Sequence, residues 1–174
     1  MSICPDCGHR NFEGAESCEI CHGSLSELGP DRPQSPLEQH LVKDTIEQLA
    51  PREPLLVPPE MPVGEVLQRM AARKGGCAII TSNRQVIGIF TDRDALMRLN
   101  IDDPGWKDRP IAEVMTSPVE TLEMRDPIAF AMHKMDLGGY RHLPVLNEGR
   151  IVGIVSVRDL LNYLMTSLVR IPGA

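Results

Sequence analysis

Residues 87–96 read IGIFTDRDAL, and residues 152–161 read VGIVSVRDLL. The two stretches lie 65 residues apart and have Gly, Ile, Arg, Asp and Leu at matching positions. The same offset aligns three further identical pairs: Pro62 with Pro127, Met70 with Met135, and Ile46 with Ile111. A match that holds in four segments indicates that one supersecondary unit is present twice.

The first half of each unit reads as a helical turn, a short extended piece and a helix. The turns are expected at residues 46–49 and 111–115, and the extended pieces at residues 55–57 and 119–122. In the helix that follows, apolar residues recur at i, i+3, i+4 and i+7, which is the period of an amphipathic helix. A proline stands at the start of each of these helices, where its fixed φ is favourable.

The second half of each unit reads as two strands and a helix. The strands are expected at residues 77–80 and 85–90, and again at 143–146 and 150–155, with a polar turn inside each pair. The closing helix is expected to begin at Thr91 or Ser156 and to bury its leucines, including Leu96 and Leu161. The sequence therefore predicts a mixed α+β fold with the order β-α-β-β-α, twice.

This repeated order resembles the CBS domain pair, also called a Bateman module, over about residues 40–170. The resemblance is carried by residues 88–94 (GIFTDRD), 153–159 (GIVSVRD) and 140–145 (YRHLPV). It implies that two repeats pack sheet to sheet and leave two clefts for adenosine-containing ligands, and that two chains pair as a homodimer. We expect the repeats to occupy residues 40–103 and 104–174.

Two residues of each shared motif are candidates for ligand contacts. Thr91 and Asp94 fall on the first turn of a helix, where free N–H groups and the positive helix end favour an anion. A hydroxyl can donate to phosphate, and a carboxylate can accept from ribose hydroxyls. Ser156 and Asp159 reproduce the arrangement, and the resemblance assigns phosphate and ribose contacts to all four. The same pattern is also a capping box, which serves only the helix start.

Basic residues near these motifs differ between the repeats. Arg93 and Arg158 add positive charge beside both helix starts. Arg141 and His142 precede the inner strand of the second repeat, where the resemblance implies phosphate contacts, whereas residues 75–76 of the first repeat are both glycine. We therefore expect the second repeat to be better equipped for a polyphosphate.

Four of the five cysteines form two C-x-x-C pairs within the first 21 residues: Cys4, Cys7, Cys18 and Cys21. Two such turns joined by a short connection present four sulfurs to one tetrahedral ion, most simply structural Zn²⁺, with iron or two disulfides as alternatives. The residues 4–8 resemble the knuckle of zinc ribbons and, less closely, of rubredoxins. With few apolar residues, this module needs a metal to fold. We place it at residues 1–28, followed by a proline-rich linker at 29–39.

The charge and the distribution of apolar residues disfavour several classes of function. The net charge is −6, and the first 30 residues carry five acidic side chains against one Arg, which disfavours nucleic-acid binding. No apolar run is long enough to span a bilayer and no signal peptide is recognised, so a cytoplasmic location is expected. A closed four-cysteine site offers no position for a substrate.

These observations predict a non-catalytic regulatory protein that binds AMP, ADP, ATP or a related adenosyl ligand and acts on an unidentified protein partner. Two alternatives stay open at this point. One is a structural dimerisation adaptor without a ligand, and the other is a nucleic-acid regulator that uses the zinc ribbon.

Overall fold

The computed structural model describes residues 2–4, 7–12, 15–23, 25 and 36–170. The chain divides into two compact units, one formed by residues 1–51, 122–143 and 155–174 and the other by residues 52–121 and 144–154. Residues 29–35 of the expected linker lie outside the described residues, and residues 36–39 already belong to helix α1 (Pro36–Lys43). Each compact unit therefore takes segments from both sequence repeats.

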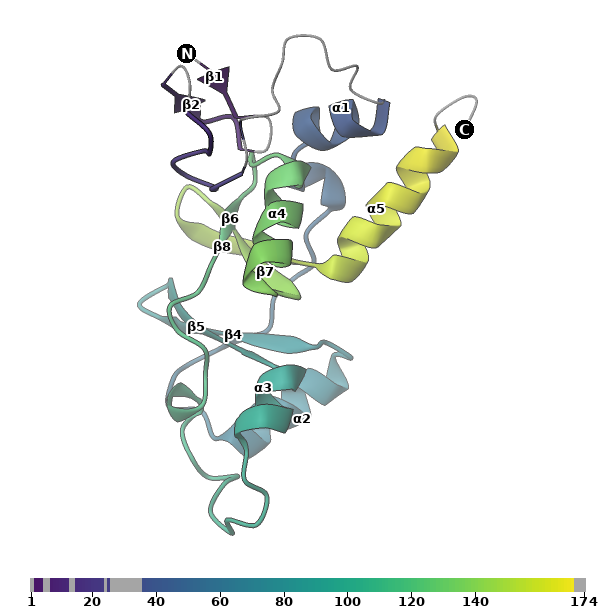
Figure 1. Ribbon diagram of the computed structural model, residues 1–174. Coiled ribbons are helices and arrows are strands. Elements are labelled where there is room, and N and C mark those ends of the chain that lie inside the picture. The colour runs from purple at the N-terminus through teal and green to yellow at the C-terminus, as the bar shows by residue number, and fades with distance from the viewer. Residues whose placement is uncertain (1, 5–6, 13–14, 24, 26–35, 171–174) are drawn as a thin grey trace. The chain divides into compact units, whose positions relative to one another are not determined.

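The two repeats have the expected elements in the expected order (Figure 1). The first repeat runs through η1 (Ile46–Leu49), β3 (Leu56–Val57), α2 (Val63–Ala72), β4 (Cys77–Ser82), β5 (Gln85–Thr91) and α3 (Asp92–Arg98). The second runs through η2 (Ile111–Glu113), β6 (Leu122–Glu123), α4 (Ile128–Gly138), β7 (His142–Asn147), β8 (Arg150–Ser156) and α5 (Val157–Arg170). The mixed α+β class is confirmed.

Each repeat forms a three-stranded sheet, in the orders β3-β4-β5 and β6-β7-β8. In the first sheet β3 pairs parallel with β4, and β4 pairs antiparallel with β5. Alternate residues of β4 point to opposite faces, so Ala78 and Ile80 join a core with helix α2, while Cys77 and Ile79 join a second apolar cluster. A small hairpin of β1 (Ser2–Ile3) and β2 (Arg10–Asn11) precedes the repeats.

The helical turn before each repeat packs against the helix start of the other repeat. Ile46 donates its backbone N–H to the Asp126 carbonyl at 3.0 Å, and Ile111 donates to the Met61 carbonyl at 2.9 Å. Both isoleucines are completely buried. This exchange explains why the compact units mix the two sequence repeats. It also places residues of α1 and η1 beside α4 and α5.

Two details differ from the sequence-based expectations. Pro62 and Pro127 occupy the capping position just before α2 and α4 and not the first helical position. Leu96 and Leu161, expected on buried helix faces, are 85% and 56% exposed. Within the described residues no helix is long and apolar enough to cross a membrane.

Candidate functional site

The start of helix α3 is a complete capping box. Asp94 donates its backbone N–H to Thr91 Oγ1 at 3.2 Å, and Thr91 donates its own N–H to Asp94 Oδ2 at 2.9 Å. The Thr91 hydroxyl also donates to the same carboxylate oxygen at 2.6 Å. One oxygen of Asp94 is therefore committed to its own helix start.

The other oxygen of Asp94 holds a distant segment. Thr116 donates its hydroxyl to Asp94 Oδ1 at 3.0 Å, and Arg98 Nε lies 3.4 Å from the same atom. Thr116 also exchanges two backbone hydrogen bonds with Ile89 of β5. Both carboxylate oxygens of the first repeat thus serve the protein's own structure.

Helix α5 of the second repeat begins in the same way. Asp159 Oδ2 accepts from the Ser156 N–H at 2.7 Å and from the Ser156 hydroxyl at 2.6 Å. Ser156 is buried, whereas Asp159 is half-buried. The predicted pair is therefore brought together, in a geometry that serves capping of α5.

A pocket of about 580 Å³ adjoins Asp159. Helix α5 contributes Asp159, Asn162 and Tyr163 to its wall, and the segment of α1 and η1 contributes polar side chains that include Asp44. The Tyr163 hydroxyl donates to the Asp44 carboxylate inside this wall. The volume falls within the roughly 300–1,000 Å³ typical of small-molecule sites.

The basic candidates lie near the same helix starts. The Arg141 carbonyl accepts the N–H of Val157, the first residue of α5, at 3.1 Å. The Gly76 carbonyl makes the same bond to Asp92 in the first repeat at 3.0 Å. Gly76 therefore corresponds to Arg141 and Cys77 to His142, at the same offset of 65 as the rest of the repeat, so the expected comparison with residues 75–76 was wrong by one position.

Exposure separates the basic side chains further. Arg93, Arg158 and Arg141 are exposed, and His142 is half-buried at the start of β7. The hydrogen bond from the Val157 N–H to the Arg141 carbonyl places the backbone of residue 141 beside the Ser156–Asp159 helix start. The second repeat thus combines Ser156, Asp159 and Arg141 in one region.

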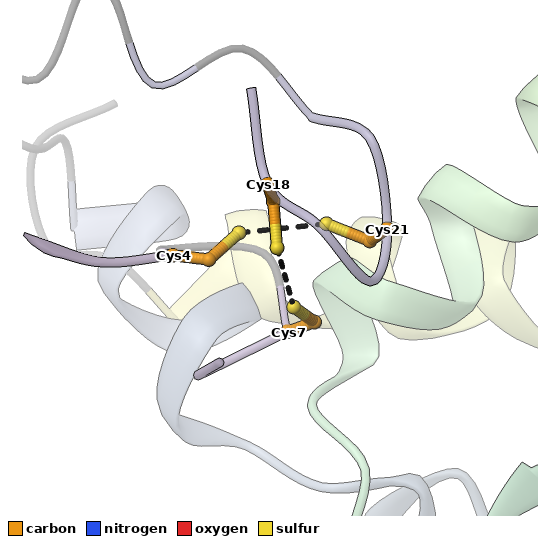
Figure 2. A group of neighbouring side chains, drawn as sticks. All are labelled: Cys4, Cys7, Cys18 and Cys21. Atoms are coloured by element: carbon orange, nitrogen blue, oxygen red, sulfur yellow. Dashed lines mark hydrogen bonds between the residues drawn. The ribbon is translucent and has the colours of Figure 1, made fainter. Parts of the chain in front are cut away.

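The four cysteines gather in a second candidate site. Cys4 Sγ lies 3.4 Å from Cys21 Sγ, and Cys7 Sγ lies 3.5 Å from Cys18 Sγ (Figure 2). All four sulfurs lie within 4.8 Å of one another. Sulfurs about 2.3 Å from a tetrahedral zinc ion are roughly 3.8 Å apart, which fits this cluster. The distances are too long for disulfide bonds, and all four cysteines are free.

The two C-x-x-C turns share one backbone geometry. Gly8 donates its N–H to the Cys4 carbonyl and His22 donates to the Cys18 carbonyl, both at 2.9 Å. Both residues have positive φ, +72° at Gly8 and 59° at His22. Because only the first of these is glycine, the second knuckle tolerates a strained side chain to keep the turn.

Four cysteines this close together can all be thiolates only if a cation neutralises their charge. Burial raises the pKa of Cys7 to about 11. Burial acts to raise the pKa of Cys18 as well, but hydrogen bonds from the backbone of Cys21 and Ile20 and from the Cys7 and Cys21 side chains together outweigh it and lower that pKa to about 6. A bound dication displaces such protons and holds all four groups as thiolates. The donor set therefore fits Zn²⁺ or iron.

Several residues at these sites escaped sequence reasoning. Thr116 and Tyr163 act on acids far away in the sequence, and no local pattern announces them. His133 donates from Nε2 to the Cys21 carbonyl. Phe130 packs against the cysteine cluster. An alignment of α4 with α2 would have singled out Phe130 and His133, because the aligned residues of α2 are Glu65 and Gln68.

A duplicated α+β unit with two matching helix starts and a pocket beside one of them defines a tandem-repeat module. A model of the CBS domain family matches residues 46–101 and 111–166, which together are more than half of the chain. The chain therefore belongs to the CBS-domain family and is a CBS-pair regulatory module.

Known proteins agree with this assignment. A CBS domain-containing protein of Arabidopsis thaliana is 34% identical over 120 residues, which cover 67% of this chain but only 22% of that protein. An uncharacterized 17.7 kDa protein of Acidianus ambivalens is 30% identical over 122 residues, covering 69% of this chain and 73% of that one. A CBS domain protein of Pyrobaculum aerophilum, solved in complex with AMP, has a TM-score of 0.61 and 27% identity over 73% of this chain and 99% of that chain.

Proposed function

We propose that the chain is a non-catalytic sensor that binds an adenosine-containing ligand, AMP, ADP or ATP, at the second repeat. Asp159 accepts from the ribose hydroxyls, Ser156 and the α5 helix start contact phosphate, and Arg141, His142 and Arg158 supply positive charge. Thr91, Arg93 and Asp94 are the corresponding set of the first repeat. The repeats at residues 40–103 and 104–174 carry these sets, and the metal module occupies residues 1–28.

The observation that carries this proposal is the pocket of about 580 Å³ beside Asp159. Its wall offers amide and hydroxyl groups, Asn162 and Tyr163, which suit the donors and acceptors of a nucleoside. A carboxylate has about four lone-pair sites, so capping through Oδ2 does not exhaust the capacity of Asp159. The complex of the Pyrobaculum relative with AMP supports the choice of ligand class.

The first repeat is the weaker candidate for a physical reason. Asp94 Oδ1 already accepts from Thr116 and faces Arg98, so a ribose would have to displace both. In the first repeat the residue that corresponds to Arg141 is Gly76, which supplies no charge. We therefore assign the ligand to the second repeat.

A titration calorimetry series tests this assignment. AMP, ADP and ATP are each titrated into the wild type, Asp159→Asn and the matched control Asp94→Asn. We expect at least one nucleotide to bind, Asp159→Asn to weaken it about tenfold or more, and Asp94→Asn to leave it within about threefold. Absence of heat with all three nucleotides, or equal losses in both variants, contradicts the proposal.

Exposed aliphatic residues favour a second, compatible role as a homodimer. Leu96 and Met97 of α3, and Leu161 and Met165 of α5, are each more than half exposed. Such side chains are more typical of an interface than of a solvated helix face. We propose that ligand binding regulates a partner protein through this dimer, in the cytoplasm. If the wild type binds no nucleotide but is a dimer by light scattering, the structural adaptor becomes the better interpretation.

The cysteine module is proposed to hold structural Zn²⁺, with iron as the alternative ion. Its described part does not favour a nucleic-acid role, since Glu16 and Glu19 accompany a single Arg10. Salt-sensitive binding of DNA or RNA by the full chain would overturn that conclusion.

A further inference from the structure

The cysteine module contacts one face of helix α4. His133 donates from Nε2 to the Cys21 carbonyl. Phe130 packs against the buried cluster formed by the module. The Lys134 ammonium lies 4.7 Å from the centroid of the Phe130 ring, on the same outward side of the helix. The contact lies within one compact unit and joins the module to the second repeat.

Helix α2 provides an internal comparison, because it is the aligned copy of α4. The inward residues are alike and buried in both helices: Val63 and Ile128, Val66 and Ala131, Met70 and Met135. The outward residues differ, since Phe130, His133 and Lys134 replace Glu65, Gln68 and Arg69.

Burial follows this difference. The outward trio of α2 is exposed, and Arg69 pairs with Glu65 of its own helix at 2.6 Å. The outward trio of α4 is half-buried. The two helices have therefore diverged on the face that meets the cysteine module while keeping the same face toward their cores.

We infer that the outward face of α4 is a docking surface for the metal-bound cysteine module, so that metal occupancy stabilises α4 and with it the second repeat. The module has little apolar support of its own, because Ile3, Phe12 and Ile20 are all more than half exposed. Among the described residues, the turn that presents the Cys21 carbonyl is otherwise held by single backbone hydrogen bonds, such as that from the Cys18 N–H to the Gly23 carbonyl at 2.8 Å, and each of these is weaker than a metal–thiolate bond. Metal loss then removes the acceptor of His133 and uncovers Phe130.

This inference concerns the metal and not the nucleotide, and it holds whether or not a nucleotide binds. Hydrogen–deuterium exchange of the full chain tests it, with one equivalent of Zn²⁺ or with a chelator. We expect amides of α4 to exchange about tenfold faster after chelation and those of α2 to be unchanged. An equal response of the two helices, or no response of α4, overturns the inference.

A variant gives the matched control. Phe130→Glu with His133→Gln installs the residues that α2 has at the aligned positions, so the helix itself tolerates them. We expect this variant to bind one Co²⁺ per chain, seen by thiolate charge-transfer absorption, while α4 exchange no longer depends on metal. His133→Ala alone keeps the Phe130 contact, so it should lose only part of the metal-dependent change in α4 exchange. A full wild-type response in both variants overturns the inference.

Discussion

Replacing Asp94 by alanine should destabilise the protein through two separate losses. The first is the cap of helix α3, which rests on hydrogen bonds of 2.9 and 2.6 Å from Thr91. Loss of such a cap costs about 0.5–2 kcal/mol. The second is the bond from Thr116, after which a part-buried hydroxyl has lost its acceptor at a cost of about 1 kcal/mol. Arg98 is nearly half exposed and adds little.

The expected total is about 1.5–3 kcal/mol. Water replaces these contacts poorly, because the Asp94 side chain is only 14% exposed. Urea unfolding followed by circular dichroism measures the loss. A double-mutant cycle with Thr116→Val should give a coupling of about 1 kcal/mol. A loss below about 0.5 kcal/mol for Asp94→Ala, or a coupling near zero, would refute the structural role of this carboxylate.

Three further predictions concern the cysteines and the exposed helices. The wild type should bind one Zn²⁺ per chain by metal analysis, Cys4→Ser should bind none, and Cys77→Ser should bind as the wild type does; equal loss in both variants contradicts the assigned ligand set. Burial raises the pKa of Cys77 to about 12 from an ordinary value of 9.0, so its contribution to stability should be complete below about pH 9 and lost between about pH 9 and 12. Between about pH 9 and 12, Cys77→Ala should therefore lose less free energy of unfolding than the wild type does. An identical loss in both proteins argues against a buried thiol. Leu161→Glu should convert the proposed dimer to a monomer by light scattering without lowering the melting temperature, and a large loss of melting temperature would show that this leucine belongs to the core.

The sequence was a good guide wherever the information was local or duplicated. From residue 46 onward the repeat located the strands and helices within a few residues, because apolar periodicity and the prolines before α2 and α4 act over a single turn, whereas α1 (Pro36–Lys43) was not predicted. The C-x-x-C spacing likewise brought four sulfurs into one cluster. These features need no knowledge of distant contacts.

The errors arose where partners are distant in the chain. Leu96 and Leu161 have helical spacing but lie on faces that this chain does not cover, and periodicity alone cannot tell an interface from a core. The bond from Thr116 to Asp94 spans 22 residues, so the motif could not reveal that the first repeat's acid is already engaged. His133 meets Cys21 across 112 residues, beyond any local pattern.

The central claim is that a nucleotide occupies the α5 helix start of the second repeat. Backbone amide chemical shifts measured while AMP or ATP is added test this claim most directly. The account predicts that the amides of residues 156–159 move and saturate, while those of residues 91–94 stay in place. Shifts confined to residues 91–94, or spectra that do not change with either nucleotide, would contradict it.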